Sequence, residues 1–207
     1  MVIKARHHFF FYPFSKFYSG WTIRRHFGCV EVTGEFNDRK LPILLLANHF
    51  SWWDGILAMY LNVRLFKRKF HFMMLEEQLV KLTHPNLVGG YSVRKGSRSA
   101  IESINYTAEI LADRANLVLV FPQGKIESAY TYPLHFEGGV KHIIERSGPL
   151  QIIFSANLVD YFSDRKPGLF MYISEYMGDK FDSGSIQDAY NNFYKQCLNS
   201  NALKSDS

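Results

Sequence analysis

The run from Ile43 to Ala47 limits the possible folds more than any other part of this chain. It is apolar throughout, and Pro42 precedes it. A run this short and uniformly apolar predicts a strand that is buried on both faces, and the run from Leu117 to Phe121 repeats the pattern. Because such strands need helices above and below their sheet, the two runs predict an α/β fold with a mostly parallel sheet.

Segments of this kind alternate with segments of helical periodicity along the chain. We expect strands over residues 29–33, 43–47, 70–75, 87–93, 117–121, 151–157 and 169–175. We expect helices over residues 54–62, 76–82, 97–113, 138–146 and 186–198. A chain of 207 residues with no visible repeat or linker fits a single domain, which we place at residues 29–198. This domain should have a central sheet flanked by helices.

The two ends of the chain differ in composition from this domain. Residues 1–28 are rich in aromatic rings and cations, among them Phe9, Phe10, Phe11, Phe14, Lys16, Trp21, Arg24 and Arg25. This composition favours a segment that lies in the headgroup region of a membrane. The alternative is a helix packed on the protein's own core, since rings recur at helical spacing at positions 10, 14, 17 and 21. Residues 199–207 are polar, and we expect a disordered tail there.

Bulk properties narrow the choice of partner and compartment. The formal net charge of +5 suits an anionic partner such as a phospholipid surface. The cations are scattered with no nucleic-acid-reading module, so we expect no nucleic-acid partner. Cys29 and Cys197 lack a metal-binding spacing and are too few for a disulfide scaffold, which favours a reduced, cytoplasmic setting and no metal. No stretch approaches the ~18 uninterrupted apolar residues of a membrane-spanning helix.

The strand predicted at residues 43–47 delivers a histidine and a carboxylate to one edge of the sheet. His49 follows it, and Asp54 comes five residues later. Within one helix this spacing would turn the side chains ~140° apart, so we expect His49 in the loop and Asp54 at the start of the next helix. A histidine oriented by a carboxylate is suited to general-base catalysis. The alternative is a plain loop histidine and an acid favoured by the helix dipole.

Two further loops place cations at the same edge. The first leaves the second buried strand in the order Phe121, Pro122, Gln123, Gly124 and Lys125. Such a loop can hold backbone N–H groups and a lysine toward an anion. The second ends the strand at residues 87–93 with Arg94 and Lys95, which suit a phosphate at the start of a helix. Turns without chemistry are the alternative for both.

In chain order, these segments resemble the sequence blocks of the glycerophospholipid acyltransferase superfamily, which includes the 1-acylglycerol-3-phosphate (lysophosphatidic acid) acyltransferases. Asn48, His49 and Asp54 match the first block, Asn-His-x4-Asp. Residues 90–94 are similar to the second, and residues 121–124 to the third, Phe-Pro-Glu-Gly. Residues 136–140 resemble the segment that follows, and residues 151–154 occupy the place of the fourth block. The resemblance covers roughly residues 30–175.

The resemblance implies a glycerol-3-phosphate acyltransferase-like fold, with residues 29–198 as the acyltransferase domain. It implies that His49 takes the proton of an acceptor hydroxyl while Asp54 orients its imidazole. The oxygen would attack an acyl thioester carried by coenzyme A or acyl carrier protein, a co-substrate, so no further cofactor and no metal are expected. The substrate would be bound by Arg94, Lys95, Phe121, Pro122, Gln123, Gly124 and Lys125. The protein would associate peripherally with the inner face of the membrane.

Three departures from the family pattern concern the acceptor. Gln123 replaces the glutamate of the third block, Ile126 replaces the arginine usually found just beyond it, and Ser155 with Ala156 replaces the closing proline of the fourth. The nearest cation to Ile126 is Lys125, and a lysine offers only a point charge, whereas an arginine binds phosphate in bidentate fashion. We therefore expect lysophosphatidic acid to be a modest substrate, and an alcohol that depends less on phosphate, such as an aminolipid, glycolipid or pigment hydroxyl, to be preferred.

Two other functions remain possible from the sequence. One is a non-catalytic domain that binds lipid headgroups with a degenerate acyltransferase fold, for which Gln123 and Ile126 argue. The other is a serine hydrolase with Ser99 as nucleophile, because residues 96–100 are close to a nucleophile elbow. Against the hydrolase, the last position of that segment is alanine and a basic turn precedes it. The intact His49 and Asp54 favour the enzyme over the pure binder.

Overall fold

The fold is built on one sheet, seen in a computed structural model that describes residues 2–94 and 98–204. Within these residues seven strands have the order β1-β7-β6-β2-β5-β3-β4. They are β1 (Cys29–Thr33), β2 (Ile43–Ala47), β3 (Lys69–Leu75), β4 (Gly90–Val93), β5 (Asn116–Val120), β6 (Gln151–Asp160) and β7 (Gly168–Glu175). Strands β6, β2, β5, β3 and β4 run parallel, while β7 is antiparallel to β6 and pairs in parallel with β1. The prediction of a mostly parallel sheet is confirmed.

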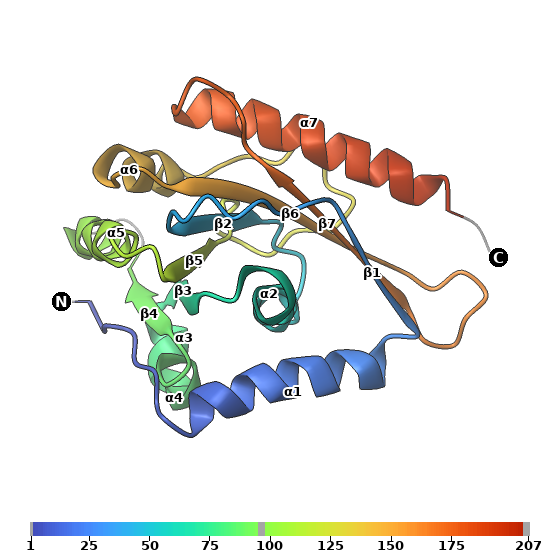
Figure 1. The fold of residues 1–207 in the computed structure, drawn as a ribbon, viewed down its shortest axis with the longest axis horizontal. Helices are drawn as coiled ribbons and strands as arrows, with labels where there is room; N and C mark the ends of the chain where they lie inside the picture. The colour runs from blue at the N-terminus through green and yellow to red at the C-terminus, as the bar shows by residue number, and fades with distance from the viewer. Residues whose placement is uncertain (1, 95–97, 205–207) are drawn as a thin grey trace.

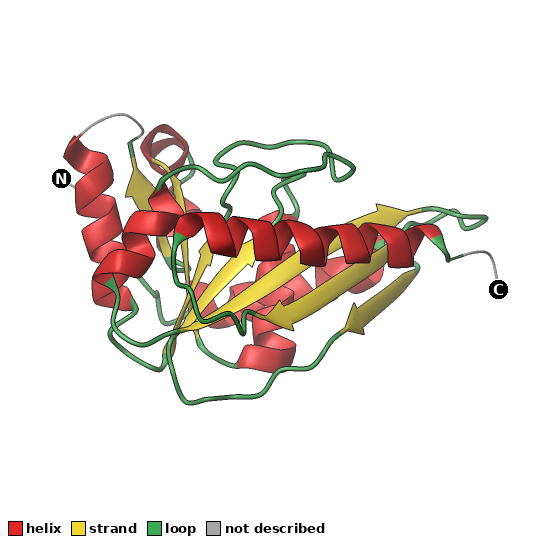
Figure 2. Ribbon diagram, turned by 90° about the horizontal axis from the view of Figure 1, so that it is seen from above, coloured by secondary structure: helices red, strands yellow, loops and turns green. Residues whose placement is uncertain are grey.

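Helices cover both faces of this sheet, as Figures 1 and 2 show. They are α1 (Phe11–His26), α2 (Asp54–Leu61), α3 (Glu76–Lys81), α4 (Thr83–Asn86), α5 (Arg98–Ile110), α6 (Gly139–Arg146) and α7 (Ser183–Ala202), with a π-helical turn η1 (Asn62–Phe66) after α2. Buried residues of α5, α6 and α7 form one half of the core, and those of α1 and α2 form the other. The helix α7 lies across the first face, and α1 lies on the outer side of α2 (Figure 1).

Strand β2 is fixed from both sides. Leu44 and Leu46 belong to the half of the core beneath α5, α6 and α7, whereas Ile43 and Leu45 belong to the half beneath α1 and α2. All four are fully buried. Each buried side chain of this size contributes about 1.5–3 kcal/mol of transfer free energy. The loop that follows β2 therefore starts from one of the best-anchored points of the molecule.

Several boundaries differ from those expected, most clearly at the C-terminus. The carboxylate of Asp182 caps α7 by accepting the backbone N–H of Ser185 at 3.0 Å, so the helix starts at Ser183. The helix ends at Ala202. Residues 199–202 were expected to be disordered, and this part of the prediction is wrong, because buried Asn201 bonds the side chains of Asp160 and Tyr172. Polar residues form a helical turn here since the sheet supplies their partners.

The N-terminal segment is a strap followed by a helix. In the strap, Ile3 donates its N–H to Ser92 Oγ at 2.8 Å, and His7 forms a bridge with Val88, so the chain runs beside β4. Helix α1 then packs on α2, with Ser19, Thr22 and Ile23 buried. The helix indicated by the spacing of the rings is confirmed. The expectation that these rings pack on the core is wrong, because they face outward, with exposed fractions of 59% for Phe10, 50% for Phe14, 68% for Phe17 and 48% for Trp21. Among the described residues, no helix is both long and apolar enough to cross a membrane.

Candidate active site

His49 and Asp54 meet at the carboxyl end of β2. His49 lies in the loop, and Asp54 is the first residue of α2, as their spacing predicts. The imidazole Nδ1 of His49 lies 2.6 Å from Asp54 Oδ2. The Asp54 side chain is 1% exposed and that of His49 is 24% exposed. The carboxylate is therefore enclosed by protein, while the imidazole can be reached from outside.

The bonds of Asp54 determine which nitrogen of His49 carries the proton. Oδ2 also accepts the backbone N–H of Phe50 at 2.8 Å and of Ser51 at 3.0 Å, and Oδ1 accepts the hydroxyl of Ser51 at 3.0 Å. A carboxylate that only accepts is ionised, so His49 Nδ1 must be the donor. Within residues 2–94 and 98–204, His49 Nε2 has no hydrogen-bond partner. In this tautomer the lone pair of Nε2 is free, as a general base requires.

Phe121 and Gln123 contact His49 from the end of β5. The ring of Phe121 stacks on the imidazole, with 4.2 Å between centroids and an interplanar angle of 11°. The side-chain Oε1 of Gln123 accepts the backbone N–H of His49 at 2.6 Å. Gln123 is buried, so this contact is shielded from water. The two loops that follow β2 and β5 are thereby joined at the histidine.

The remaining residues of the β5 loop give it its shape. Pro122 is buried, and its carbonyl accepts the backbone N–H of Glu137 at 2.7 Å. Gly124 has φ +64°, a conformation that other residues rarely adopt. Lys125 Nζ lies 2.9 Å from Glu127 Oε1. The lysine expected to face an anion therefore already has a carboxylate partner.

Glu127 is a site residue that the sequence analysis did not find. Its backbone N–H donates to the carbonyl of His49 at 2.9 Å, and its Oε2 accepts the side-chain amide of Gln123 at 2.9 Å. The hydrogen bond from Gln123, followed by that from Lys125, lowers the pKa of the Glu127 carboxyl. The sequence offers one signal for it, since Glu127 is an acid that follows four residues after Gln123, the position where a glutamate is expected. A cavity of about 410 Å³ opens beside these residues, lined by Gln123, Lys125, Glu127, His135, Phe136 and Glu137.

Asn48 fixes the direction in which the chain leaves β2. Its Nδ2 donates to the carbonyl of Asn157 at 3.0 Å, and its Oδ1 accepts the N–H of Asn157 at 2.8 Å. The side chain thus continues the pairing of β2 with β6 by one step after the backbone turns away. Asn48 is 1% exposed, and its amide is used in bonds to Asn157 and to the hydroxyl of Tyr194. Its place in the motif is explained by positioning rather than by contact with a substrate.

Arg94 lies at the same edge of the sheet but at a distance from His49. It follows β4, and two strands, β3 and β5, separate β4 from β2. At about 4.8 Å per strand this places the two strand ends ~14 Å apart. Arg94 forms an ion pair with Glu76, the first residue of α3. Lys95, the other cation predicted here, lies outside the described residues.

The serine-hydrolase alternative falls partly outside the described residues, which do not include positions 96 and 97. Ser99, its expected nucleophile, lies in the first turn of α5 rather than in a turn before the helix. Its Oγ is buried and has no hydrogen-bond partner among the described residues. A serine nucleophile needs an adjacent base, so Ser99 is not arranged for this chemistry.

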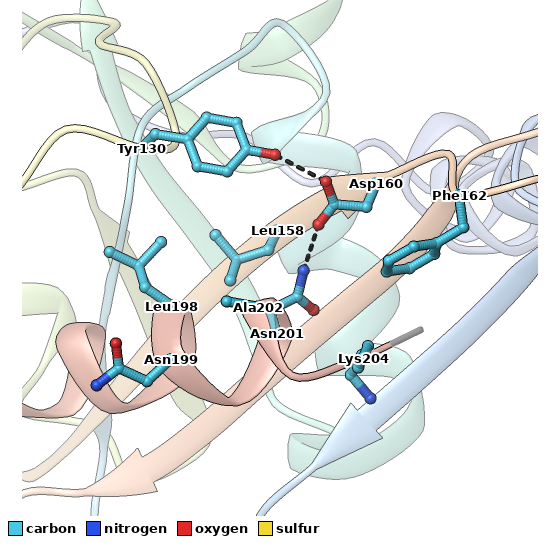
Figure 3. Close-up of a pocket in the computed structure, with 9 residues that line it drawn as sticks. All are labelled: Tyr130, Leu158, Asp160, Phe162, Leu198, Asn199, Asn201, Ala202 and Lys204. Carbon is cyan, nitrogen blue, oxygen red and sulfur yellow. Dashed lines mark hydrogen bonds between the residues drawn. The ribbon is translucent and has the colours of Figure 1, made fainter. Parts of the chain in front are cut away.

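A second cavity, of about 360 Å³, lies between the end of β6 and α7 (Figure 3). Its carboxylate, Asp160, accepts the hydroxyl of Tyr130 at 2.8 Å and the side-chain amide of Asn201. Asp160 is about 10 Å further along β6 than Asn157, on which Asn48 rests. The cavity is therefore separate from His49, and its acid already serves to bind α7 to the sheet.

Together the fold and the site define an α/β protein in which a histidine is held by a buried carboxylate at the carboxyl edge of the parallel strands. Among the described residues, no cluster of three or more His, Cys, Asp or Glu side chains could hold a metal ion. The chain belongs to the Acyltransferase family, whose model matches residues 29–155. The site residues His49, Asp54 and Gln123 all lie within this match.

Solved structures include one with the same fold. It is the crystal structure of the 1-acyl-sn-glycerophosphate (LPA) acyltransferase PlsC from Thermotoga maritima, which superposes with a TM-score of 0.65. The sequences are 14% identical over 94% of this chain and 80% of that chain. This likeness extends the family resemblance from sequence to the whole fold. A comparison with curated protein sequences gives no match.

Proposed function

We propose that the protein transfers a fatty acyl group from acyl-CoA or acyl carrier protein to a hydroxyl of a lipid or lipid-like acceptor. The observation that carries the proposal is the contact of 2.6 Å between His49 Nδ1 and Asp54 Oδ2. It holds the imidazole in the tautomer whose Nε2 can accept a proton. Membership of the Acyltransferase family supports the same reaction.

The chemistry follows from this tautomer. Nε2 of His49 takes the hydroxyl proton while the acceptor oxygen attacks the thioester carbonyl. A carbon–oxygen bond forms and the carbon–sulfur bond breaks. The thiolate leaves as a thiol with the proton that the imidazole had taken. Asp54 stays ionised and stabilises the transient imidazolium, so no covalent enzyme intermediate is needed.

The outer face of α1 supports a membrane surface as the place of reaction. About half or more of each side chain is exposed at four aromatic positions, Phe10, Phe14, Phe17 and Trp21. The guanidinium carbon of Arg25 lies 5.5 Å from the centre of the Trp21 ring. Apolar rings beside cations suit the interface of an anionic bilayer. Trp52, in the loop between His49 and α2, is 71% exposed. The loop that carries His49 therefore also exposes a large aromatic ring.

The charges around the site favour an acceptor without a phosphomonoester. Of the three cations predicted to bind a phosphate, the two within the described residues are engaged by acids, Arg94 by Glu76 and Lys125 by Glu127. The cavity beside Gln123 is lined by two carboxylates, one lysine and one histidine, so it offers no excess positive charge. We therefore expect a neutral or amine-bearing lipid alcohol to be acylated faster than lysophosphatidic acid.

A non-catalytic lipid-binding domain is the second candidate, because Gln123 and Ile126 depart from the family pattern. Incubation of the protein with labelled acyl-CoA or acyl carrier protein and a lipid extract decides between the two. We expect a new acylated lipid, identified by its mass, with purified lysophosphatidic acid a poorer acceptor than an aminolipid. If vesicles bind the protein but no acyl group is transferred from either donor, the binding domain is correct.

A further inference from the structure

The backbone of His49 is held on both sides by one short loop. Its N–H donates to Gln123 Oε1 at 2.6 Å, and its carbonyl accepts the N–H of Glu127 at 2.9 Å. Gln123 Nε2 donates in turn to Glu127 Oε2 at 2.9 Å. These three bonds close a ring that begins and ends at the catalytic histidine. A shift of this loop would therefore move the backbone of His49, and its imidazole with it.

Only an amide at position 123 completes this ring beside an acid at position 127. The side chain at 123 must accept one hydrogen bond, from His49, and donate another, to the carboxylate of Glu127. A carboxylate at 123 could accept from His49, but its second oxygen would face Glu127 Oε2 at the 2.9 Å now spanned by the bond from Gln123. Like charges at this distance in a mostly buried site repel strongly. Gln123 and Glu127 therefore depend on each other.

We propose that Gln123 and Glu127 form one positioning unit, in which Glu127 supplies the acid that the family pattern places at position 123. Gln123 links the negative charge of this acid to His49 by bonding both the Glu127 carboxylate and the backbone N–H of His49. The unit acts through His49 and does not touch the reacting atoms. This inference rests on the proposed acyl transfer. It makes the glutamine a compensated change rather than a sign of a degenerate site.

Lys125 adjusts the charge of the unit. Its Nζ lies 2.9 Å from Glu127 Oε1, the oxygen that Gln123 leaves free. Both oxygens of Glu127 are thus satisfied, and His135, which lines the same cavity, also lowers the pKa of this carboxyl. The carboxylate is ionised at neutral pH. An unneutralised second acid at position 123 would have no cation of its own in this arrangement.

The test is a swap of the two side chains. We expect Gln123→Glu to lower kcat ~10–100-fold with a smaller change in KM, because a displaced base slows the chemical step more than binding. Glu127→Gln, which still can accept the bond from Gln123, should stay within ~3-fold of wild type. The double variant Gln123→Glu/Glu127→Gln restores one amide facing one acid, and it should recover kcat to within ~5-fold of wild type.

Glu145→Gln is the matched control. Glu145 also pairs with a lysine and a histidine, Lys141 and His142, but on the outer side of α6. It should leave kcat unchanged. Wild-type kcat in the Gln123→Glu variant would overturn the proposal, and so would a folded double variant as slow as Gln123→Glu. If Gln123→Glu does not fold, the double variant alone decides, since the proposal requires it to fold and to turn over. Absence of transfer in the wild type would instead contradict the proposed function.

Discussion

The imidazole of His49 lies flat on the ring of Phe121, with 4.2 Å between the ring centroids and 11° between their planes. The carboxylate of Asp54 holds the same imidazole by its edge. One contact fixes the plane of the ring and the other fixes its rotation within that plane. The imidazole therefore has a defined direction before any substrate is bound. Preorganisation of this kind is what lowers the cost of aligning reacting groups.

Phe121→Leu is expected to lower kcat about 10-fold, because the imidazole loses the flat surface that restricts its plane. Phe121→Tyr keeps the ring and should retain nearly all activity. Steady-state kinetics of both variants, with thermal unfolding as a check on the fold, measure the effect. Equal activity of the leucine and tyrosine variants would mean that stacking has no part in orienting the base.

The outward rings of α1 predict a reversible membrane contact. The triple variant Phe14→Ser/Phe17→Ser/Trp21→Ser should bind anionic vesicles at least ~10-fold more weakly than wild type, since three exposed apolar side chains are lost. Binding of the wild type should also weaken as salt rises, because Arg24 and Arg25 attract the lipid surface electrostatically. Co-sedimentation with vesicles at two salt concentrations measures both effects.

A control for this prediction comes from an exposed ring elsewhere. Phe181, just before α7, is 52% exposed, and Phe181→Ser should leave vesicle binding unchanged. The triple variant changes no buried residue of α1, so its thermal unfolding should match the wild type. Undiminished vesicle binding by the folded triple variant would assign the membrane contact to another surface.

His71 predicts how stability depends on pH. It is buried in β3, and its ring lies 4.7 Å from that of His7 in the N-terminal strap. Burial, followed by the charges of His7 and Lys69, lowers its pKa from 6.5 to about 4. As pH falls from 6.5 toward 4, the unfolded chain takes up a proton at His71 that the folded protein does not. Stability is therefore present above pH 6.5 and is lost progressively over this interval.

The size of the loss follows from the same shift. Wild-type protein should lose about 3 kcal/mol of unfolding free energy at His71 between neutral pH and pH 4, on top of other titrating groups. His71→Gln cannot take up the proton, so its unfolding free energy should fall less over the same range. Urea unfolding at several pH values compares the two slopes. Identical slopes would show that His71 does not contribute to the pH dependence of stability.

The central strands were predictable because their environment leaves a local trace. A strand buried on both faces must be apolar at every position, and Leu44 and Leu45 of β2 meet this condition on opposite faces. The C-terminal end of β6 was not predictable for the opposite reason. This strand continues through Asn157 and Asp160, whose polar groups are satisfied by residues far away in the chain. Local polarity therefore marked an end where the structure has none.

The same distinction holds for the candidate site. His49 and Asp54 are close in sequence, and a turn of known geometry brings them together, so their contact could be predicted. Gln123 reaches His49 across 74 positions of sequence, through the pairing of β2 with β5. The sequence showed Gln123 only as a departure from a pattern. The role of its partner Glu127 can be recognised only when the ends of β2 and β5 are known to lie side by side.

The most direct test of His49 as the general base is to measure acyl transfer by a variant of His49 and a variant of Asp54. His49→Ala removes the proton acceptor, and Asp54→Asn replaces the charged carboxylate, with its two accepting oxygens, by an amide that has only one. We expect each to reduce kcat ~100-fold or more, since this is the usual contribution of a positioned general base. The loop position of His49 should allow the alanine variant to keep its thermal midpoint, whereas loss of the Asp54 hydrogen bonds should lower that of the asparagine variant somewhat. A folded His49→Ala variant that transfers acyl groups at the wild-type rate would contradict the central claim.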